Sequence, residues 1–283
     1  MQPKPKGVSG YDYFPQLIAD NQVLSLLQQC DYQMVAFETG FFFTNYPRAD
    51  VYLSAGSELS EFEGLLLADT PVDMLLVKIV VEPPERSYAA HRQRVLYTFE
   101  QLQELPEMRG PKLTFAHIVS PHPPFVFDAQ GDPIQPNRSY SIGDGNDYRG
   151  TWQEYRQGYA GQVQFVNRML EETVDAIIRK SSQPPVIILQ GDHGPGGHLQ
   201  WKSPVQTCLW ERTPIFNAYY LPGGGEKWLY PDISPVNSFR VVLNEYFGTN
   251  FELLPGETLF TSHIPGADFI DITANRDSKN NCN

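Results

Sequence analysis

The segment between Pro184 and Trp201 constrains the fold of this chain more than any other. It begins with a proline pair and a continuous apolar run, Val-Ile-Ile-Leu, and continues as Gln-Gly-Asp-His-Gly-Pro-Gly-Gly-His. A short apolar run without alternation is typical of a strand that is buried on both faces of a parallel sheet. Because such a strand needs neighbouring strands and covering helices, the segment predicts an α/β domain.

Two residues with metal-binding side chains, Asp192 and His193, follow this strand directly, and a glycine-rich loop leads from them to His198. Ligands of open α/β sheets bind where strands end and loops begin. An adjacent carboxylate and imidazole can face one ion, and this mixed pair suits zinc or manganese. The same residues also fit a plain turn in which the aspartate side chain bonds nearby backbone and the histidine has no ligand.

Helix and strand patterns alternate along the rest of the chain. Helical spacing predicts helices over residues 21–29, 58–68, 85–105, 152–180 and 238–247; strands are predicted over 33–37, 50–53, 112–120 and 213–221, and residues 74–81 fit either. The alternation predicts a mostly parallel sheet sandwiched by helices. We expect a single α/β domain over residues 16–273, after an irregular segment (1–15) and before a flexible, frayed tail (274–283).

A second unusual segment, Ser-Pro-His-Pro-Pro-Phe, follows the strand predicted over residues 112–120. Prolines on both sides of His122 exclude regular structure and fix the backbone. His122 is therefore expected on a rigid loop just past a strand. His117 lies within the predicted strand and is expected to be packed and hydrogen-bonded, whereas His91 and His263 are expected at the surface.

Charge and cysteine content exclude several classes of protein. The net charge is −12 and no run of lysine and arginine exceeds two residues, which argues against a nucleic-acid partner. The three cysteines, Cys30, Cys208 and Cys282, are widely spaced, so we expect neither a zinc ribbon nor a disulfide framework. No apolar run approaches the roughly 18 residues of a membrane span, and we expect no transmembrane segment.

With these pieces in order, the chain resembles the alkaline phosphatase/sulfatase superfamily, in particular the sulfatase-like membrane proteins that include lipoteichoic acid synthases and phosphoethanolamine transferases. Four segments within residues 20–260 carry the resemblance: the Gln-Gly-Asp-His-Gly run, the His-Ile-Val-Ser-Pro-His-Pro-Pro-Phe segment, the helix between them, and Pro-Asp-Ile-Ser-Pro-Val-Asn-Ser-Phe-Arg at 231–240.

The resemblance implies an alkaline-phosphatase-like fold and a metal-dependent hydrolase or transferase acting on phosphate or sulfate esters, which can be lipid-linked. It implies Asp192 and His193 as ligands of a divalent metal, zinc or manganese, and His122 and His198 as catalytic groups that bind substrate oxygens or assist the leaving group. Such enzymes act at the extracytoplasmic face of the membrane.

The chain departs from the family pattern at its N-terminal side. The family places an acidic metal ligand at the end of a first strand and a threonine or serine nucleophile at the start of a later helix, and the irregular stretch of about twenty residues before the first helix contains neither element. The fold is therefore expected to be incomplete on that side, with a possible membrane-anchored portion upstream. Glu38 and Thr39, just past a strand, can substitute chemically, although an ordinary turn also explains them. The alternative is that the chain is non-catalytic, as a truncated homologue or as a distal fragment of such a membrane-anchored enzyme.

Overall fold

The computed structural model describes residues 21–56, 87–261 and 269–282. The irregular segment 1–15, the helix predicted over 58–68, the segment 74–81 and His263 lie outside the described residues. The chain divides into two compact units. We call residues 11–143 and 149–174 the sheet unit, and residues 1–10, 144–148 and 175–283 the loop unit; each is described by itself.

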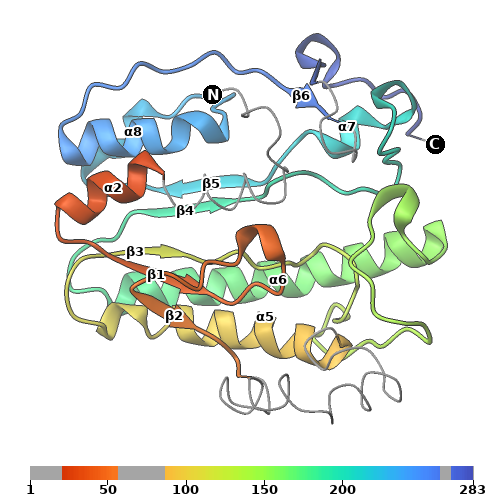
Figure 1. The fold of residues 1–283 in the computed structure, drawn as a ribbon, viewed down its shortest axis with the longest axis horizontal. Helices are drawn as coiled ribbons and strands as arrows, with labels where there is room; N and C mark the ends of the chain where they lie inside the picture. The colour runs from red at the N-terminus through yellow and green to blue at the C-terminus, as the bar shows by residue number, and fades with distance from the viewer. Residues whose placement is uncertain (1–20, 57–86, 262–268, 283) are drawn as a thin grey trace, which may run out of the picture. The chain divides into compact units, whose positions relative to one another are not determined.

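The sheet unit is built on three parallel strands, which confirms the predicted α/β class. The strands β1 (Gln33–Phe37), β2 (Val51–Leu53) and β3 (Lys112–Phe115) lie in the order β2-β1-β3 (Figure 1). Because β1 is central, its Val35, Ala36 and Phe37 are almost fully buried. The chain leaves β1 for one neighbour and later returns to the other, so the carboxyl ends of β1 and β3 lie at a topological switch point.

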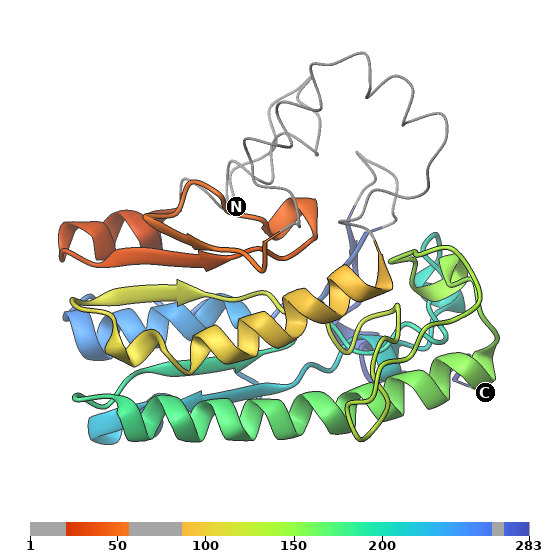
Figure 2. The ribbon, with the colours of Figure 1, turned by 90° about the horizontal axis from the view of Figure 1, so that it is seen from below.

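Helices flank these strands where the sequence places caps and apolar stripes. Helix α2 (Gln22–Gln29) begins at Asn21, whose side chain accepts from the Leu24 amide at 2.9 Å, and α5 (Tyr88–Leu102) begins at Ser87 in the same way. The long helix α6 (Trp152–Lys180) matches its predicted range, and its first part runs alongside α5 (Figure 2). Aromatic and aliphatic side chains between α5 and α6 form the main core of the unit: Tyr88, Val95, Phe99, Val126, Phe127, Phe165 and Val166.

The loop unit contains β4 (Ile187–Gln190) and β5 (Asn217–Tyr220), which pair antiparallel, with Gln190 opposite Asn217. The predicted strand therefore forms, but the parallel pairing expected for it is wrong, because its partner in the described residues is the next strand along the chain. Three residues of β4 are only half-buried, as an antiparallel pair with one solvated face requires. The unit also contains α7 (Leu209–Arg212), α8 (Pro235–Phe247), β6 (Leu259–Phe260) and β7 (Ile270–Asp271).

Short 3-10 turns connect these elements: η1 (Phe42–Thr44), η3 (Leu105–Glu107), η4 (Gly145–Asp147), η5 (Pro204–Gln206), η6 (Pro222–Trp228) and η7 (Thr273–Asn275). Within the described ranges, no helix combines the length and the apolar character needed to cross a bilayer.

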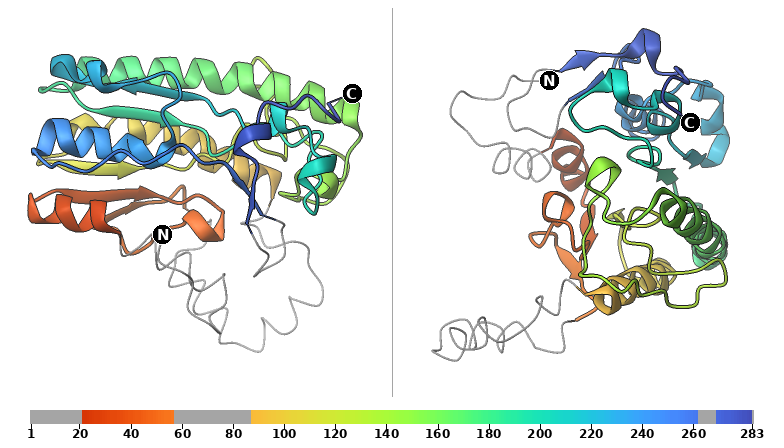
Figure 3. Two further views of the ribbon diagram at one scale, coloured as in Figure 1. Left: turned by 90° about the horizontal axis from the view of Figure 1, so that it is seen from above. Right: turned by 90° about the vertical axis from the view of Figure 1, so that its right-hand side faces the viewer.

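The C-terminal tail is attached to α7 by one disulfide, which the cysteine spacing did not predict. Cys208 and Cys282 form a disulfide across a sequence separation of 74, while Cys30 is free and exposed. The Trp210 amide also donates to the Ser278 carbonyl at 3.0 Å, and the Lys279 ammonium lies over the Trp210 ring. Figure 3 shows the backbone of this C-terminal segment in dark blue. The tail predicted to fray therefore makes specific contacts up to Cys282.

Candidate functional site

Asp192 and His193 lie side by side at the end of β4. The His193 amide donates to Asp192 Oδ1 at 3.0 Å, and His193 Nε2 lies 3.4 Å from Asp192 Oδ2. The Asp192 side chain is 69% exposed and that of His193 30%. The two side chains predicted as metal ligands thus face each other in a solvated position.

The orientation of the His193 ring is fixed by its other nitrogen. Nδ1 lies 2.9 Å from the Gly194 carbonyl oxygen. A carbonyl can only accept, so Nδ1 carries the proton, and the lone pair of the neutral ring is on Nε2. Metal-binding histidines commonly donate their second N–H to a carbonyl or carboxylate in this way.

The separation of the two side chains suits ligands of one ion. With ligand bonds of about 2.0 Å and tetrahedral angles, two ligands of one zinc ion lie about 3.3 Å apart, close to the observed 3.4 Å. Among the described residues, no group of three or more His, Cys, Asp or Glu side chains is arranged to hold a metal. Asp192 and His193 are therefore a pair of possible ligand types at a suitable separation, without a third such side chain beside them in the described ranges.

The glycines of this loop are required by close packing. A Cβ on Gly194 would lie 2.1 Å from the Glu211 carbonyl oxygen, and one on Gly196 would lie 2.2 Å from the Asp144 carboxylate. Neither position can hold a side chain without moving its neighbours, so the loop can pass this close to α7 and Asp144 only with glycine at both.

Helix α7 anchors the loop through a buried ion pair. Arg212 donates through Nη1 to Asp144 Oδ2 at 2.9 Å and to the Gly194 carbonyl at 3.0 Å, and its backbone carbonyl accepts from the Gly194 amide. The Asp144 side chain is 2% exposed. Trp201 covers the guanidinium and donates through its indole nitrogen to the Asp144 carbonyl.

His198 is paired with a second residue of α7. Its Nδ1 lies 2.7 Å from Glu211 Oε2, and the Cys208 amide donates to the His198 carbonyl. A carboxylate at Nδ1 holds the imidazole in the orientation and tautomer that a general acid or base needs at Nε2. Asp144, Glu211 and Arg212 were not predicted, since residues 13 to 68 positions apart in sequence meet only through the fold.

His122 belongs to the sheet unit, whereas Asp192, His193 and His198 belong to the loop unit. Its Nδ1 donates to the Pro123 carbonyl at 2.6 Å, and Gln162 of α6 donates to the His122 carbonyl. The fully buried Gln162 also accepts from the amides of Val126 and Phe127. The proline-rich loop is therefore held by one glutamine, and His122 lies on a fixed backbone as predicted.

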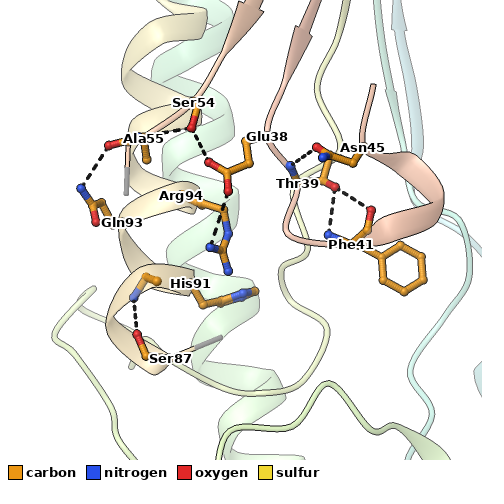
Figure 4. A network of polar contacts seen from close by, with 12 residues as sticks. Glu38, Thr39, Phe41, Asn45, Ser54, Ala55, Ser87, His91, Gln93 and Arg94 are labelled. Carbon is orange, nitrogen blue, oxygen red and sulfur yellow. Dashed lines mark hydrogen bonds and ion pairs between the residues drawn. The ribbon is translucent and has the colours of Figure 1, made fainter. Parts of the chain in front are cut away.

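Glu38 and Thr39, considered as substitutes for the missing ligand and nucleophile, have structural partners (Figure 4). The Thr39 hydroxyl donates to the Phe41 carbonyl and accepts from the Phe41 amide, both at 3.0 Å. Glu38 accepts from the Ser54 hydroxyl at 2.5 Å and lies 3.9 Å from Arg94. This is the hydroxyl turn that the sequence also allowed.

The remaining described histidines are both in the sheet unit. His117 follows β3, and its Nδ1 lies 2.6 Å from the Thr44 hydroxyl, so it is hydrogen-bonded as predicted. His91 was predicted at the surface, but it is 2% exposed on the core face of α5. Burial, assisted by Arg94, lowers the pKa of His91 to about 3. The signal was present in the sequence, because His91 lies one helical turn before the core residue Val95.

The comparisons with known proteins give no family to which the chain can be assigned. No protein-family model matches it, and no curated protein and no solved structure does either.

Proposed function

We propose that this chain is a metal-dependent hydrolase or transferase of phosphate or sulfate esters in which Asp192 and His193 hold a zinc or manganese ion. The observation that carries the proposal is the pair of donor atoms 3.4 Å apart, with the ring fixed through Gly194. A bound divalent cation would polarise an ester oxygen and offset negative charge in the transition state.

His198 is the proposed general acid or base. Glu211 at its Nδ1 fixes the orientation of the ring, so that Nε2 can give a proton to a leaving oxygen or take one from an attacking hydroxyl. His122 is proposed to bind substrate oxygens, an assignment that rests on its proline-flanked loop and on the family resemblance. The same resemblance supports an alkaline-phosphatase-like fold and a lipid-linked substrate.

The disulfide supports an extracytoplasmic location for this chemistry. Disulfides persist in oxidising compartments and are rare in the cytosol. Cys208 begins α7, which carries Glu211 and Arg212, so the bond adjoins the site. An enzyme acting on membrane-linked esters outside the cytoplasm is consistent with it.

Turnover of simple esters tests the proposal. The oxidised protein would be incubated with aryl phosphate, phosphodiester and aryl sulfate substrates, with zinc, manganese or excess chelator. We expect metal-dependent release of the aryl alcohol from at least one ester, loss of turnover in Asp192→Asn, and a large loss in His198→Gln without loss of metal binding. If none of the three esters is turned over with either metal, the catalytic proposal fails and the non-catalytic alternative is favoured.

A further inference from the structure

Arg212 of α7 holds both polar backbone groups of Gly194, the residue that follows the proposed ligand His193. Its Nη1 donates to the Gly194 carbonyl at 3.0 Å, and its own backbone carbonyl accepts from the Gly194 amide at 2.8 Å. The peptide groups on both sides of Gly194 are therefore fixed to one residue of α7. Because Arg212 lies 18 positions further along the chain, these contacts belong to the fold and not to the local turn.

The Gly194 carbonyl is also the group that fixes the His193 ring. It accepts from His193 Nδ1 at 2.9 Å and from Arg212 at 3.0 Å, and a carbonyl oxygen has two lone pairs, one for each donor. The two donors therefore meet at one oxygen atom. An arginine that fixes the position of this oxygen also determines where the Nδ1 proton is bound, and with it the direction of Nε2.

The charge of Arg212 is balanced within the loop unit. Its Nη1 donates to Asp144 Oδ2 at 2.9 Å, and the side chains of Arg212 and Asp144 are only 12% and 2% exposed. The Trp201 ring lies over the guanidinium, with Cζ 5.4 Å from the ring centroid. A guanidinium that is paired and covered in this way attracts a phosphate or sulfate group weakly. Arg212 is therefore placed to support the loop and not to bind the ester.

We propose that Arg212, oriented by Asp144, is a positioning residue for the metal ligand His193: through the Gly194 carbonyl it holds the imidazole proton on Nδ1 and keeps the Nε2 lone pair directed to the cation. The outer partners of metal-binding histidines set the tautomer and orientation of the ring. Here the partner carbonyl is itself set by the arginine. The inference rests on the proposed function for the cation alone, because the tautomer of the metal-free ring can be measured without it.

The tautomer of His193 in the metal-free protein tests the proposal directly. Imidazole nitrogen NMR signals would be recorded with chelator at about pH 8.5, where ordinary imidazoles are neutral, and assigned by their loss in His193→Gln. In neutral histidine outside a protein the proton is mostly on Nε2, so a proton held on Nδ1 reports the contact with Gly194. We expect the Nδ1–H form to dominate in the wild type and to lose its dominance in Arg212→Lys, whose side chain is one bond shorter but still balances Asp144.

Arg240→Lys is the matched control in the same unit. Arg240 of α8 also donates through Nη1 to a backbone carbonyl, that of Glu252 at 2.9 Å, and it also lies over an aromatic ring, that of Phe251. The control removes a contact of the same kind without involving Gly194. A purely structural role for Arg212 would lower stability in both variants and change the tautomer in neither.

A second variant keeps the test decisive if Arg212→Lys does not fold. The double variant Asp144→Asn/Arg212→Met removes both members of the buried ion pair, so no unpaired charge is left in the interior. It also lacks the donor to the Gly194 carbonyl, and the same loss of the Nδ1–H form is expected.

Zinc affinity, measured by calorimetry, is the second readout. We expect about tenfold weaker binding in Arg212→Lys, the lower end of what a lost outer partner costs, and wild-type affinity in Arg240→Lys. The proposal is overturned if the wild-type ring carries its proton on Nε2, if Arg212→Lys and wild type show the same tautomer, or if both bind zinc equally. A wild type that binds no zinc contradicts the proposed function, while the comparison of tautomers still decides the role of Arg212.

Discussion

In the loop unit, Asp192 and His193 follow β4 with most of the aspartate side chain in solvent, whereas in the sheet unit Glu38 follows β1 and faces an almost fully buried guanidinium. Both segments place an acidic side chain just past a strand, and both hold a histidine nearby. They differ in which part is buried. In the loop unit the Arg212–Asp144 ion pair that holds the loop is buried, while the candidate ligand Asp192 is exposed. In the sheet unit the cation beside the acidic side chain, Arg94, is itself buried.

This difference assigns different chemistry to the two units. A solvated carboxylate and imidazole can exchange water for a cation at little cost. Buried polar groups that have lost their hydration are instead held by each other, as the Arg94 guanidinium is by Glu38. The proposed cation therefore belongs to the loop unit.

The largest expected effect concerns the buried histidine. The pKa of His91 is about 3 in the folded chain and 6.5 in a model peptide. Because the pKa is lowered, the unfolded chain takes up the proton at a higher pH than the folded chain. The contribution of neutral His91 to the free energy of unfolding is therefore fully present above about pH 6.5. It falls as the pH drops toward 3, by up to about 1.4 kcal/mol per pH unit.

Denaturant unfolding at a series of pH values measures this slope, with His91→Gln as the test and His193→Gln, at a half-exposed position, as the control. His91→Gln should show a shallower loss of stability between pH 6.5 and 3, while the control keeps the wild-type slope. Equal slopes in wild type and His91→Gln would show that His91 is not held neutral by burial.

The next effect concerns the disulfide that attaches the C-terminal tail to α7. Removing the Cys208–Cys282 bond, which closes a separation of 74 residues, should lower the free energy of unfolding by about 4 kcal/mol on the loop-entropy model. Thermal unfolding of Cys282→Ser measures it, and Cys30→Ser is the matched control because Cys30 is free and exposed. A wild-type melting temperature in Cys282→Ser would mean that the tail does not anchor α7.

A smaller loss is expected within the loop itself. Gly194→Ala places a methyl group against the Glu211 carbonyl oxygen, and should cost about 1–3 kcal/mol through overpacking. Gly256→Ala meets no atom within 4 Å and serves as the control. Chemical denaturation of both variants would compare them, and equal stability would contradict the close approach of the loop to α7.

Local patterns in the sequence were sufficient to predict much of the fold. The apolar spacing of residues 152–180 matches α6, because an amphipathic helix shows its period in the sequence. The apolar run within 33–37 matches β1, a central strand that is buried on both faces. The pairing of β4 could not be predicted in this way. A short apolar run fits parallel and antiparallel partners alike, and the partner is chosen by the connection that follows.

The candidate site was predicted only in its adjacent part. Asp192 and His193 are neighbours in sequence, so their proximity could be predicted. The partners of His198 and Arg212, namely Glu211 and Asp144, come from different segments, and ion pairs across a fold leave no local pattern. Cys208 and Cys282 have a spacing that fits no motif, so the disulfide could be found only from the structure.

The most direct test of the central claim is the affinity of the oxidised protein for zinc and manganese, measured by calorimetry and confirmed by elemental analysis. We predict stoichiometric binding that is lost in His193→Ala and in Asp192→Ala and retained in His198→Gln, since His198 is already paired with Glu211. Binding that survives in both single-ligand variants, or that is absent from the wild type, would contradict a metal site on Asp192 and His193.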